Sequence, residues 1–293
     1  MHQGAANHLL RAGRFVGLVF ATFISIISII ESSARAGEAI KIGTYRHYPP
    51  WTISDDAGKI TGFEIDMIND LCQRMGTKCE ITSVDWERVY DELDSKTYDA
   101  YIGCMTITQE RAKRALFSLP YALTPEYFAT LSGNELTSLL ILNRLDLDSM
   151  NTEEQASFKI LMEALRGKRV GVHVDTVYEE FAKQYLAKIS DVRVYHVENE
   201  KYADMVHGKL DAILDGGAAL HEFIIAKNSG GSELTLFGPA MIGGPFGHGV
   251  GVAMRPGNED LRKRFDTAIT AAKADGTLAR LTLTWFGYNA ATE

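Results

Sequence analysis

The sequence predicts an α/β fold divided between two lobes. Short β-rich runs alternate with helical patterns over residues 40–117, and the same alternation returns over residues 168–228. Such a βαβα order favours mostly parallel sheets with helices on their faces. Residues 37–293 are also too many for one compact core of ordinary size, so two units suit the length better.

The first residues have the layout of a secretory signal peptide. Arg11 and Arg14 precede an apolar run over residues 15–30, and Ala34-Arg35-Ala36 follows with small residues at the A-x-A positions. A membrane anchor is the alternative, but the run is shorter than the roughly 20 apolar residues of a spanning helix. We expect cleavage after Ala36 and, in a Gram-negative cell, a soluble periplasmic protein.

Composition and motifs exclude several classes of partner. The chain has 30 basic and 38 acidic residues, of which three arginines and Glu31 lie within residues 1–36. Residues 37–293 alone therefore have a formal net charge of about −10, which argues against nucleic acid. The chain has neither a G-x-G-x-x-G nor a P-loop lysine motif, and its histidines lack metal-ligand spacing. We expect no nucleotide, cofactor or metal.

Each expected strand is a short β-rich run, and each expected helix is the longer helical pattern that follows it. In the first unit the strands are residues 40–45, 79–85 and 98–107, and the helices are residues 62–76, 86–96 and 108–117. In the second unit the strands are residues 168–175, 192–197 and 211–217, and the helices are residues 176–186, 198–210 and 218–228.

Two extended segments are expected to join the units, one near residues 122–128 and one near residues 239–248. The closing helix, residues 258–276, then belongs to the first unit, which gives a hinge of two strands. Residues 134–166 are longer than an ordinary connection. Asn151 or Thr152 is a plausible cap for a helix in its second half, and its first half has no clear assignment.

Two of the three cysteines are close in sequence. Cys72 and Cys79 could form a disulfide across a helix-to-strand turn, worth about 2.5 kcal/mol on the chain-entropy model. The alternative is two reduced cysteines in a core. Cys104 is expected to be unpaired.

The segment GCMTITQER, which joins an expected strand to an expected helix, could bind an anion. Thr106 and Thr108 offer hydroxyl donors, the helix start offers free amides, and Arg111 adds a planar guanidinium that can take a carboxylate with two hydrogen bonds. Such sites are usual at the carboxyl ends of strands in open α/β sheets. The alternative is that Thr108 only caps the helix and Arg111 is solvated.

Other strand ends carry further candidates. Thr176 and Val177 open a helix whose amides could face the first anion site across a cleft. Asp215 follows an apolar strand and could pair with an ammonium group, or it could cap the next helix. The aromatic residues at the ends of the first unit's strands fit either a core or the wall of a small-molecule pocket. They are Tyr45, Tyr48, Trp51 and Trp86.

No catalytic constellation stands out in the sequence. Glu64 and Asp66 are two residues apart on an expected helix, so they do not share a face and are assigned to the helix start. No G-x-S-x-G motif is present.

From Ile40 to about Tyr288, the chain resembles the family 3 extracellular solute-binding proteins, the polar amino-acid receptors of ABC importers. The segments that carry the resemblance, in this order, are IKIGTYRHYPPW, GKITGFEIDMINDLCQRMGTKC, YDAYIGCMTITQERAKRALFS, GKRVGVHVDT, KLDAILD and ADGTLARLTLTWFG.

The resemblance implies a two-lobed periplasmic-binding-protein (Venus-flytrap) fold of type II with two hinge strands. Lobe 1 would comprise residues 37–124 and 245–293, and lobe 2 residues 125–244 with an insertion near residues 134–166. The disulfide between Cys72 and Cys79 is also implied, because the basic amino-acid binders of the family carry it.

The resemblance further implies that Arg111 holds an α-carboxylate, assisted by Thr106 and by the backbone amides of Thr176 and Val177. Asp215 would bind the α-ammonium group.

Tyr48 and Trp86 would enclose the ligand's side chain. Four positions depart from the family pattern. Tyr45 stands where the basic amino-acid binders have aspartate, and Cys104 stands where many relatives have serine. In the loop of lobe 2, Asp175 replaces a usual glycine and Val177 a usual threonine. We therefore do not expect lysine or arginine as the ligand.

The implied function is that of the substrate-binding component of an ABC importer. Such a protein is a monomer without enzymatic activity that binds a polar amino acid, or a related small amphoteric solute, and delivers it to a membrane permease. One alternative is a periplasmic cyclohexadienyl dehydratase on the same fold, acting on prephenate or arogenate, which needs a general acid in the cleft. Another is a sensor domain that a membrane partner reads.

Overall fold

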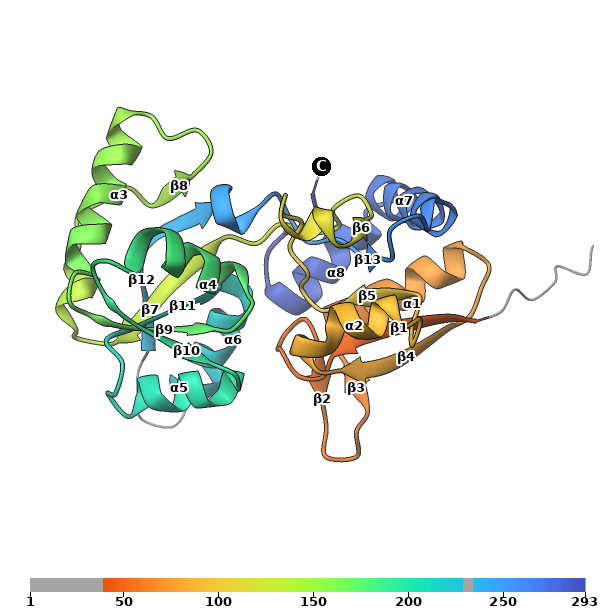
Figure 1. Cartoon of the computed structure of the whole chain (residues 1–293), viewed down its shortest axis with the longest axis horizontal. Coiled ribbons are helices and arrows are strands. Elements are labelled where there is room, and N and C mark those ends of the chain that lie inside the picture. The colour runs from red at the N-terminus through yellow and green to blue at the C-terminus, as the bar shows by residue number, and fades with distance from the viewer. Residues whose placement is uncertain (1–38, 229–233, 293) are drawn as a thin grey trace, which may run out of the picture. The chain divides into compact units, whose positions relative to one another are not determined.

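The computed structural model of the chain describes residues 39–228 and 234–292. Its strands form a five-stranded, a six-stranded and a two-stranded sheet, and helices pack beside the two larger sheets (Figure 1). The expected signal peptide, residues 1–36, lies outside the described residues. Within them, no helix combines the length and the apolar character that crossing a membrane requires.

The first sheet has the strand order β4-β1-β5-β13-β6. β1 is parallel to β4 and β5, whereas β13 is antiparallel to β5 and β6, so one edge of the sheet departs from the expected parallel pattern. The strands are β1 (Ile40–Tyr45), β4 (Cys79–Val84), β5 (Ala100–Ile102), β6 (Leu116–Phe117) and β13 (Ala253–Met254). β2 (Ile53–Ser54) and β3 (Ile60–Thr61) form the two-stranded sheet. The helices α1 (Phe63–Arg74), α2 (Val89–Asp94), α7 (Glu259–Ala274) and α8 (Thr277–Phe286) accompany this part of the chain.

The second sheet has the strand order β10-β9-β11-β7-β12-β8. β10, β9 and β11 are parallel, whereas β7 is antiparallel to both of its neighbours, β11 and β12. The strands are β7 (Glu126–Leu131), β8 (Arg144–Asp146), β9 (Arg169–His173), β10 (Asp191–Tyr195), β11 (Ala212–Gly216) and β12 (Leu234–Ile242). The helices of this part are α3 (Thr152–Ala164), α4 (Val177–Phe181), α5 (Glu198–Val206) and α6 (Gly217–Asn228).

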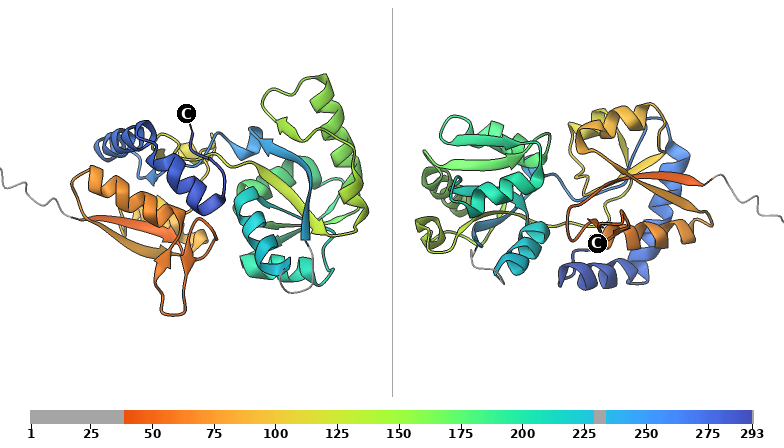
Figure 2. Two further views of the ribbon diagram at one scale, coloured as in Figure 1. Left: turned by 180° about the vertical axis from the view of Figure 1, so that it is seen from behind. Right: turned by 90° about the horizontal axis from the view of Figure 1, so that it is seen from below.

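The last two helices return to the first sheet. α7 and α8 lie beside α1, as both views of Figure 2 show. Phe265 of α7 and Phe286 of α8 share one apolar core with Phe63 of α1 and Ile42 of β1. The closing helix therefore packs with the first unit, as expected from the sequence.

Two segments connect the sheets, and they lie side by side. The chain leaves the first sheet after β6 and returns to it at β13. Between these points Tyr121 N donates to Val250 O (2.9 Å) and Val250 N donates to Ala122 O (2.8 Å). The lobe boundaries at residues 124 and 245 stay predictions, but the two neighbouring crossings are the arrangement that a hinge of two strands requires.

The prediction of a helix over residues 108–117 is wrong. Only a 3₁₀ turn forms there, over Arg111–Lys113, and Leu116 and Phe117 pair with β13. Thr108 does accept from the backbone N of Arg111 (3.2 Å), as a capping residue would. A helix of this length is marginal by itself, so the strand pairing of β6 overrides its local preference.

The long connection over residues 134–166 contains both an edge strand and a helix. Asn151 caps α3 in a capping box with Glu154, so the helix in its second half is confirmed. The first half, unassigned from the sequence, holds a 3₁₀ turn over Glu135–Ser138 and then β8, which pairs with β12 at the edge of the second sheet (Figure 1).

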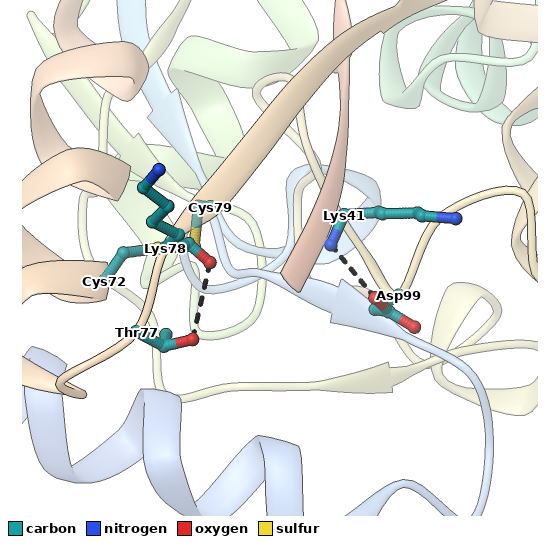
Figure 3. Close-up of a disulfide and its surroundings, with 6 residues drawn as sticks. All are labelled: Lys41, Cys72, Thr77, Lys78, Cys79 and Asp99. Carbon is teal, nitrogen blue, oxygen red and sulfur yellow. Dashed lines mark hydrogen bonds between the residues drawn. A yellow bond between two sulfur atoms is a disulfide. The ribbon is translucent and has the colours of Figure 1, made fainter. Parts of the chain in front are cut away.

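The disulfide between Cys72 and Cys79 is present, with Cα atoms 6.1 Å apart, and Cys104 is free. The bond joins the last turn of α1 to the first residue of β4 (Figure 3). On the other side of this region, the backbone N of Lys41 in β1 donates to Oδ2 of Asp99 (3.0 Å). Both contacts fix the ends of neighbouring elements around β1.

We expect the double substitution Cys72→Ser and Cys79→Ser to lower the free energy of unfolding by about 2.5 kcal/mol, because the open loop gains entropy in the unfolded chain. Chemical denaturation with and without reductant measures the loss. Reductant should destabilise the wild type to the level of the double variant and leave the variant unchanged. Equal denaturation midpoints for the oxidised wild type and the variant would contradict the expectation.

Candidate functional site

A cavity lies between loops of the two sheets. Every predicted ligand-binding residue except Asp215 lines it. The lining residues are Tyr45, Tyr48, Trp86, Gly103, Cys104, Thr106, Arg111, His173, Thr176, Val177, Tyr178 and Glu198.

The first sheet supplies one wall of the cavity from the carboxyl ends of its parallel strands. Tyr45 is the last residue of β1, Trp86 follows β4, and Cys104 follows β5. The rings of Tyr45 and Trp86 meet edge to face, with centroids 6.5 Å apart. Because parallel strands end at the same edge of a sheet, residues far apart in sequence form one aromatic surface.

Arg111 lies at the centre of this wall. Its Nη1 donates to Thr106 O (3.2 Å), its Nη2 donates to Asp175 O (3.3 Å), and its guanidinium lies 5.3 Å from the centre of the Trp86 ring. Burial lowers the pKa of the guanidinium, and the groups that favour its charge are tyrosines and Cys104 rather than carboxylates. A half-buried cation held by neutral acceptors is well suited to an anionic group from outside the chain.

The second sheet supplies the opposite wall. Thr176 caps α4 by accepting from the backbone N of Glu179 (3.4 Å), and its hydroxyl donates to His173 O (2.7 Å). The neighbouring Asp175 is exposed and does not line the cavity, so its carboxylate does not compete with an anion near Arg111. The first turn of α4 does carry Glu179, whose Oε2 accepts from the backbone N of Asp175 (2.8 Å).

Hydrogen bonds connect the two walls. Trp86 Nε1 donates to Val174 O (3.1 Å), and the Tyr48 hydroxyl donates to Asp215 Oδ1 (2.6 Å). Another joins Arg111 to Asp175, as described above. The hydroxyls of Tyr48 and Tyr178 also lie 3.2 Å apart. Residues of the first sheet thus contact the second sheet directly at the site.

Behind the cavity lies an ionic cluster centred on Lys201, whose side chain is 0% exposed. Its Nζ donates to Asp215 Oδ2 and to Glu198 Oε1, both at 2.6 Å. The other oxygen of Glu198 lies 3.1 Å from His173 Nδ1. Asp215 is therefore held by a lysine of the chain itself.

The pKa values of the cluster follow from this pairing. Burial alone would raise the pKa of Asp215, but Lys201 and the hydrogen bonds that Asp215 accepts hold it well below its usual range. Burial would likewise lower the pKa of Lys201, but Asp215 and Glu198 raise it instead. Burial and the charge of Asp215 raise the pKa of Glu198, against the effect of Lys201. Lys201 and Asp215 are thus the ionised pair of the cluster.

Two further carboxyl groups are buried near the site. Glu64 Oε1 accepts from Cys104 N (2.8 Å) and from the Tyr121 hydroxyl, so Glu64 holds the loop after β5 rather than serving only the start of α1. Burial raises the pKa of Glu64 to about 7 and that of Glu126 to about 8. Both groups are protonated in the folded protein over part of the neutral pH range.

In residues 39–228 and 234–292, no group of three or more potential metal ligands is close enough to hold a metal ion.

The model of the bacterial extracellular solute-binding proteins, family 3, matches residues 40–288. The chain belongs to this family. Its resemblance to the family, inferred from the quoted segments, is thereby confirmed, and the chain is a solute-binding protein.

Named relatives of this solute-binding protein span most of its length. The L-cystine-binding protein TcyJ of Escherichia coli (strain K12) is 34% identical over 247 residues, which cover 84% of this chain and 82% of TcyJ. The octopine-binding periplasmic protein of Rhizobium meliloti is 28% identical over 280 residues, covering 88% and 94%. A solved ancestral arginine-binding protein bound to arginine gives a TM-score of 0.70 at 26% identity, over 85% and 98% of the chains. The two-lobed type II fold is confirmed.

Sequence reasoning missed several residues of the site in this solute-binding protein. Glu198 and Tyr178 line the cavity, but each sits in a stretch that reads as an ordinary amphipathic helix. Lys201 lies in the polar segment ENEKYADM, where a lysine is expected to face solvent. The three-residue spacing of Glu198 and Lys201 is the one local signal, and it does not reveal that Asp215 is their third partner.

We expect Lys201→Met to lower the free energy of unfolding by about 3–5 kcal/mol, because it leaves the buried Asp215 without its cation. Chemical denaturation at pH 7 measures this loss. Lys209→Met is the matched control, since Lys209 forms an exposed pair with Asp204 (2.7 Å) whose loss should cost about 1 kcal/mol or less. Equal effects of the two substitutions would contradict the expectation.

The stability of Glu126→Gln relative to the wild type should depend on pH. The pKa of Glu126 is raised to about 8 in the folded protein, against about 4.3 in an unfolded chain, so between these values the folded state binds more protons. Stability from this carboxyl group is present at low pH and is lost as pH rises through about 8. The neutral glutamine avoids this loss.

Chemical denaturation at pH 5 and pH 9 tests this expectation. The variant and the wild type should differ little at pH 5, whereas the variant should be more stable at pH 9 by roughly 2–5 kcal/mol. A difference between the two proteins that stays constant with pH would show that the Glu126 carboxyl group does not titrate as expected.

Proposed function

We propose that this solute-binding protein binds a zwitterionic amino acid, or a closely related amphoteric solute, and delivers it to the permease of an ABC importer. The observation that carries this proposal is that Arg111 lines the cavity and forms no ion pair with a carboxylate among the described residues. A guanidinium can bind a carboxylate through two parallel hydrogen bonds, which gives both affinity and orientation.

The other cavity residues have separate roles in the proposal. Thr106 and the backbone amides of Thr176 and Val177 add donors for the ligand's carboxylate. Asp215, expected from the sequence to bind the ammonium group, does not line the cavity and already pairs with Lys201. Its role as an ammonium partner stays a prediction.

The aromatic residues Tyr45, Tyr48 and Trp86 form the apolar part of the cavity and would enclose the ligand's side chain. Cys104 lines the same cavity, where it would contact the ligand without carrying charge. Burial raises the pKa of its thiol well above the usual value, so it remains protonated.

L-Cystine is the first ligand to test. The relative with 34% identity is named for L-cystine, and the others reported above are named for octopine and arginine. The molecules in these names all carry a carboxylate and a protonated amine. Tyr45 supplies no charge for a basic side chain, which favours a ligand whose distal end is not a simple cation.

Binding is proposed to close two lobes, residues 37–124 with 245–293 and residues 125–244, about the paired crossing strands. A ligand shifts such an equilibrium only through contacts that differ between the two states. Arg111 from one lobe and the start of α4 from the other would provide such contacts, because both can hold the same carboxylate only when the lobes approach.

The proposal is of a binding protein without enzymatic activity. The reported relatives are all named as binding proteins, which does not favour the dehydratase alternative. We further propose export to the periplasm after cleavage behind Ala36, function as a monomer without a cofactor, and no interaction with nucleic acid.

Arg111→Ala should weaken binding by about 100-fold or more, because two charge-assisted hydrogen bonds to the ligand are lost. Isothermal titration calorimetry of residues 37–293 with L-cystine, L-arginine and L-glutamine measures the effect. Arg114→Ala is the matched control, because Arg114 lies over the Tyr90 ring (4.2 Å) outside the cavity, and its loss should leave the affinity unchanged. If the wild type binds none of these amino acids, or if Arg111→Ala binds as tightly as the wild type, the proposal is wrong.

A further inference from the structure

The carboxylate of Asp215 already has a donor for each of its lone pairs. Its Oδ2 accepts from Lys201 Nζ (2.6 Å) and from the Tyr202 hydroxyl (2.7 Å). Its Oδ1 accepts from the Tyr48 hydroxyl (2.6 Å) and from Gly216 N (2.7 Å). An ionised carboxylate has about four acceptor sites, so a ligand ammonium could bind Asp215 only by displacing one of these donors.

Glu126 is in the opposite situation. It is the first residue of β7 and lies directly opposite Gly216 of β11 in the antiparallel pair. Its side chain is 6% exposed, and within the described ranges its Oε2 has no hydrogen-bond partner. None of the ion pairs formed among residues 39–228 and 234–292 includes Glu126. A buried carboxyl group without a cation is costly to ionise, and burial accordingly raises the pKa of Glu126 to about 8.

Gly216 allows three oxygen atoms to converge. A Cβ atom at Gly216 would lie 3.0 Å from the hydroxyl oxygens of both Tyr48 and Tyr178, and 3.4 Å from Glu126 Oε2. These oxygens therefore face one small region above the glycine. Tyr48 and Tyr178 line the cavity that contains Arg111. An ammonium group donates three hydrogen bonds, so it needs several acceptors that face it together.

We propose that Glu126, rather than Asp215, provides the carboxylate that binds the ligand's ammonium group, with the hydroxyls of Tyr48 and Tyr178 as additional acceptors. This inference rests on the proposed function, in which Arg111 holds the carboxylate of the same ligand. Asp215 acts instead as a positioning residue, since it accepts from the Tyr48 hydroxyl while Lys201 balances its charge.

Glu126 reaches the cavity only through its neighbours Tyr48 and Tyr178, whereas Glu198 is itself a lining residue, but Glu198 is a weaker candidate for the ammonium. One of its oxygens accepts from Lys201 (2.6 Å), and the other faces His173 Nδ1 (3.1 Å). Glu64 is committed in a similar way, since its Oε1 accepts from Cys104 N and from the Tyr121 hydroxyl. The Oε2 atoms of Glu64 and Glu126 both lack a hydrogen-bond partner among the described residues, but Glu64 has two donors on its Oε1. Glu126 pairs with no cation there, and the hydrogen bond to its carboxyl group comes from Tyr178.

The test compares each amino acid with its counterpart that lacks the α-amino group. The pairs are L-cystine with 3,3′-dithiodipropionate, L-arginine with 5-guanidinopentanoate, and L-glutamine with glutaramate. Calorimetry on residues 37–293 gives the two dissociation constants of each pair. The wild type should prefer the amino acid by about 100-fold or more, and Glu126→Gln should reduce that preference to less than about 10-fold.

Two variants separate this role from a structural one. Glu64→Gln changes another buried glutamate, and Asp215→Asn changes the carboxylate paired with Lys201. Each should weaken both members of a ligand pair by a similar factor, because a distorted site does not distinguish an amino group. If Asp215→Asn does not fold, the comparison of Glu126→Gln with Glu64→Gln still decides the matter.

The failures of the two proposals are distinguishable. If the wild type binds no amino acid of the panel, the proposed function fails, and the inference about Glu126 fails with it. If the wild type binds one of them and Glu126→Gln retains the wild-type preference for the amino group, only the inference about Glu126 is overturned.

Discussion

The ammonium group of Lys201 is completely removed from solvent, and its neighbours are arranged to compensate for that burial. Asp215 and Glu198 both accept hydrogen bonds from it, so ion pairs with Lys201 connect the end of β11 to the first turn of α5. A buried cation is tolerated only when its partners are close and themselves hydrogen-bonded. Asp215 is therefore paired with the protein's own Lys201, and a ligand could bind it only by displacing one of its donors.

This constraint leaves the cavity with a simple distribution of charge. Among the described residues, Arg111 is a half-buried cation without a carboxylate partner, and Glu126 is a buried carboxyl group without a cation. Each is costly by itself, and a ligand with both a carboxylate and an ammonium group would compensate for both at once. The chain's own residues thus favour a zwitterion over a simple anion or a simple cation.

The arrangement also relates binding to lobe closure. Tyr48 and Arg111 come from the part of the chain that precedes β7, whereas Glu126, Tyr178 and the start of α4 belong to the second sheet or its helices. A ligand held by both groups gains its full set of contacts only when the two parts approach. The neighbouring crossing strands at Ala122 and Val250 allow that approach about a single axis.

The sequence predicted the features that depend on local patterns. The βαβα order, the disulfide between Cys72 and Cys79, and the placement of Thr106 and Arg111 beside one cavity all followed from spacing and composition together with the family resemblance. The prediction of a helix after Thr108 was wrong because the pairing of β6 with β13 outweighed the local helical pattern; Leu116 pairs with Met254, 138 residues later in the chain.

The groups that determine the charge of the site could not be predicted in the same way. Lys201 lies in a polar helix, so the sequence predicts a solvated side chain. In the structure, β9 and β11 pack against this helix and the side chain is buried. Glu126 is part of an extended segment, and its position depends on the register with Gly216, 90 residues later in the chain. The pairing of strands that are distant in the sequence is a property of the assembled sheet.

A crystal structure of the protein with the amino acid that it binds most tightly tests the assignment of charges most directly. The account predicts the ligand's carboxylate against Arg111, its amino nitrogen within hydrogen-bond distance of Glu126 Oε2, and Lys201 still paired with Asp215. An amino nitrogen bound to Asp215 in place of Lys201, with Glu126 remote from the ligand, would contradict it.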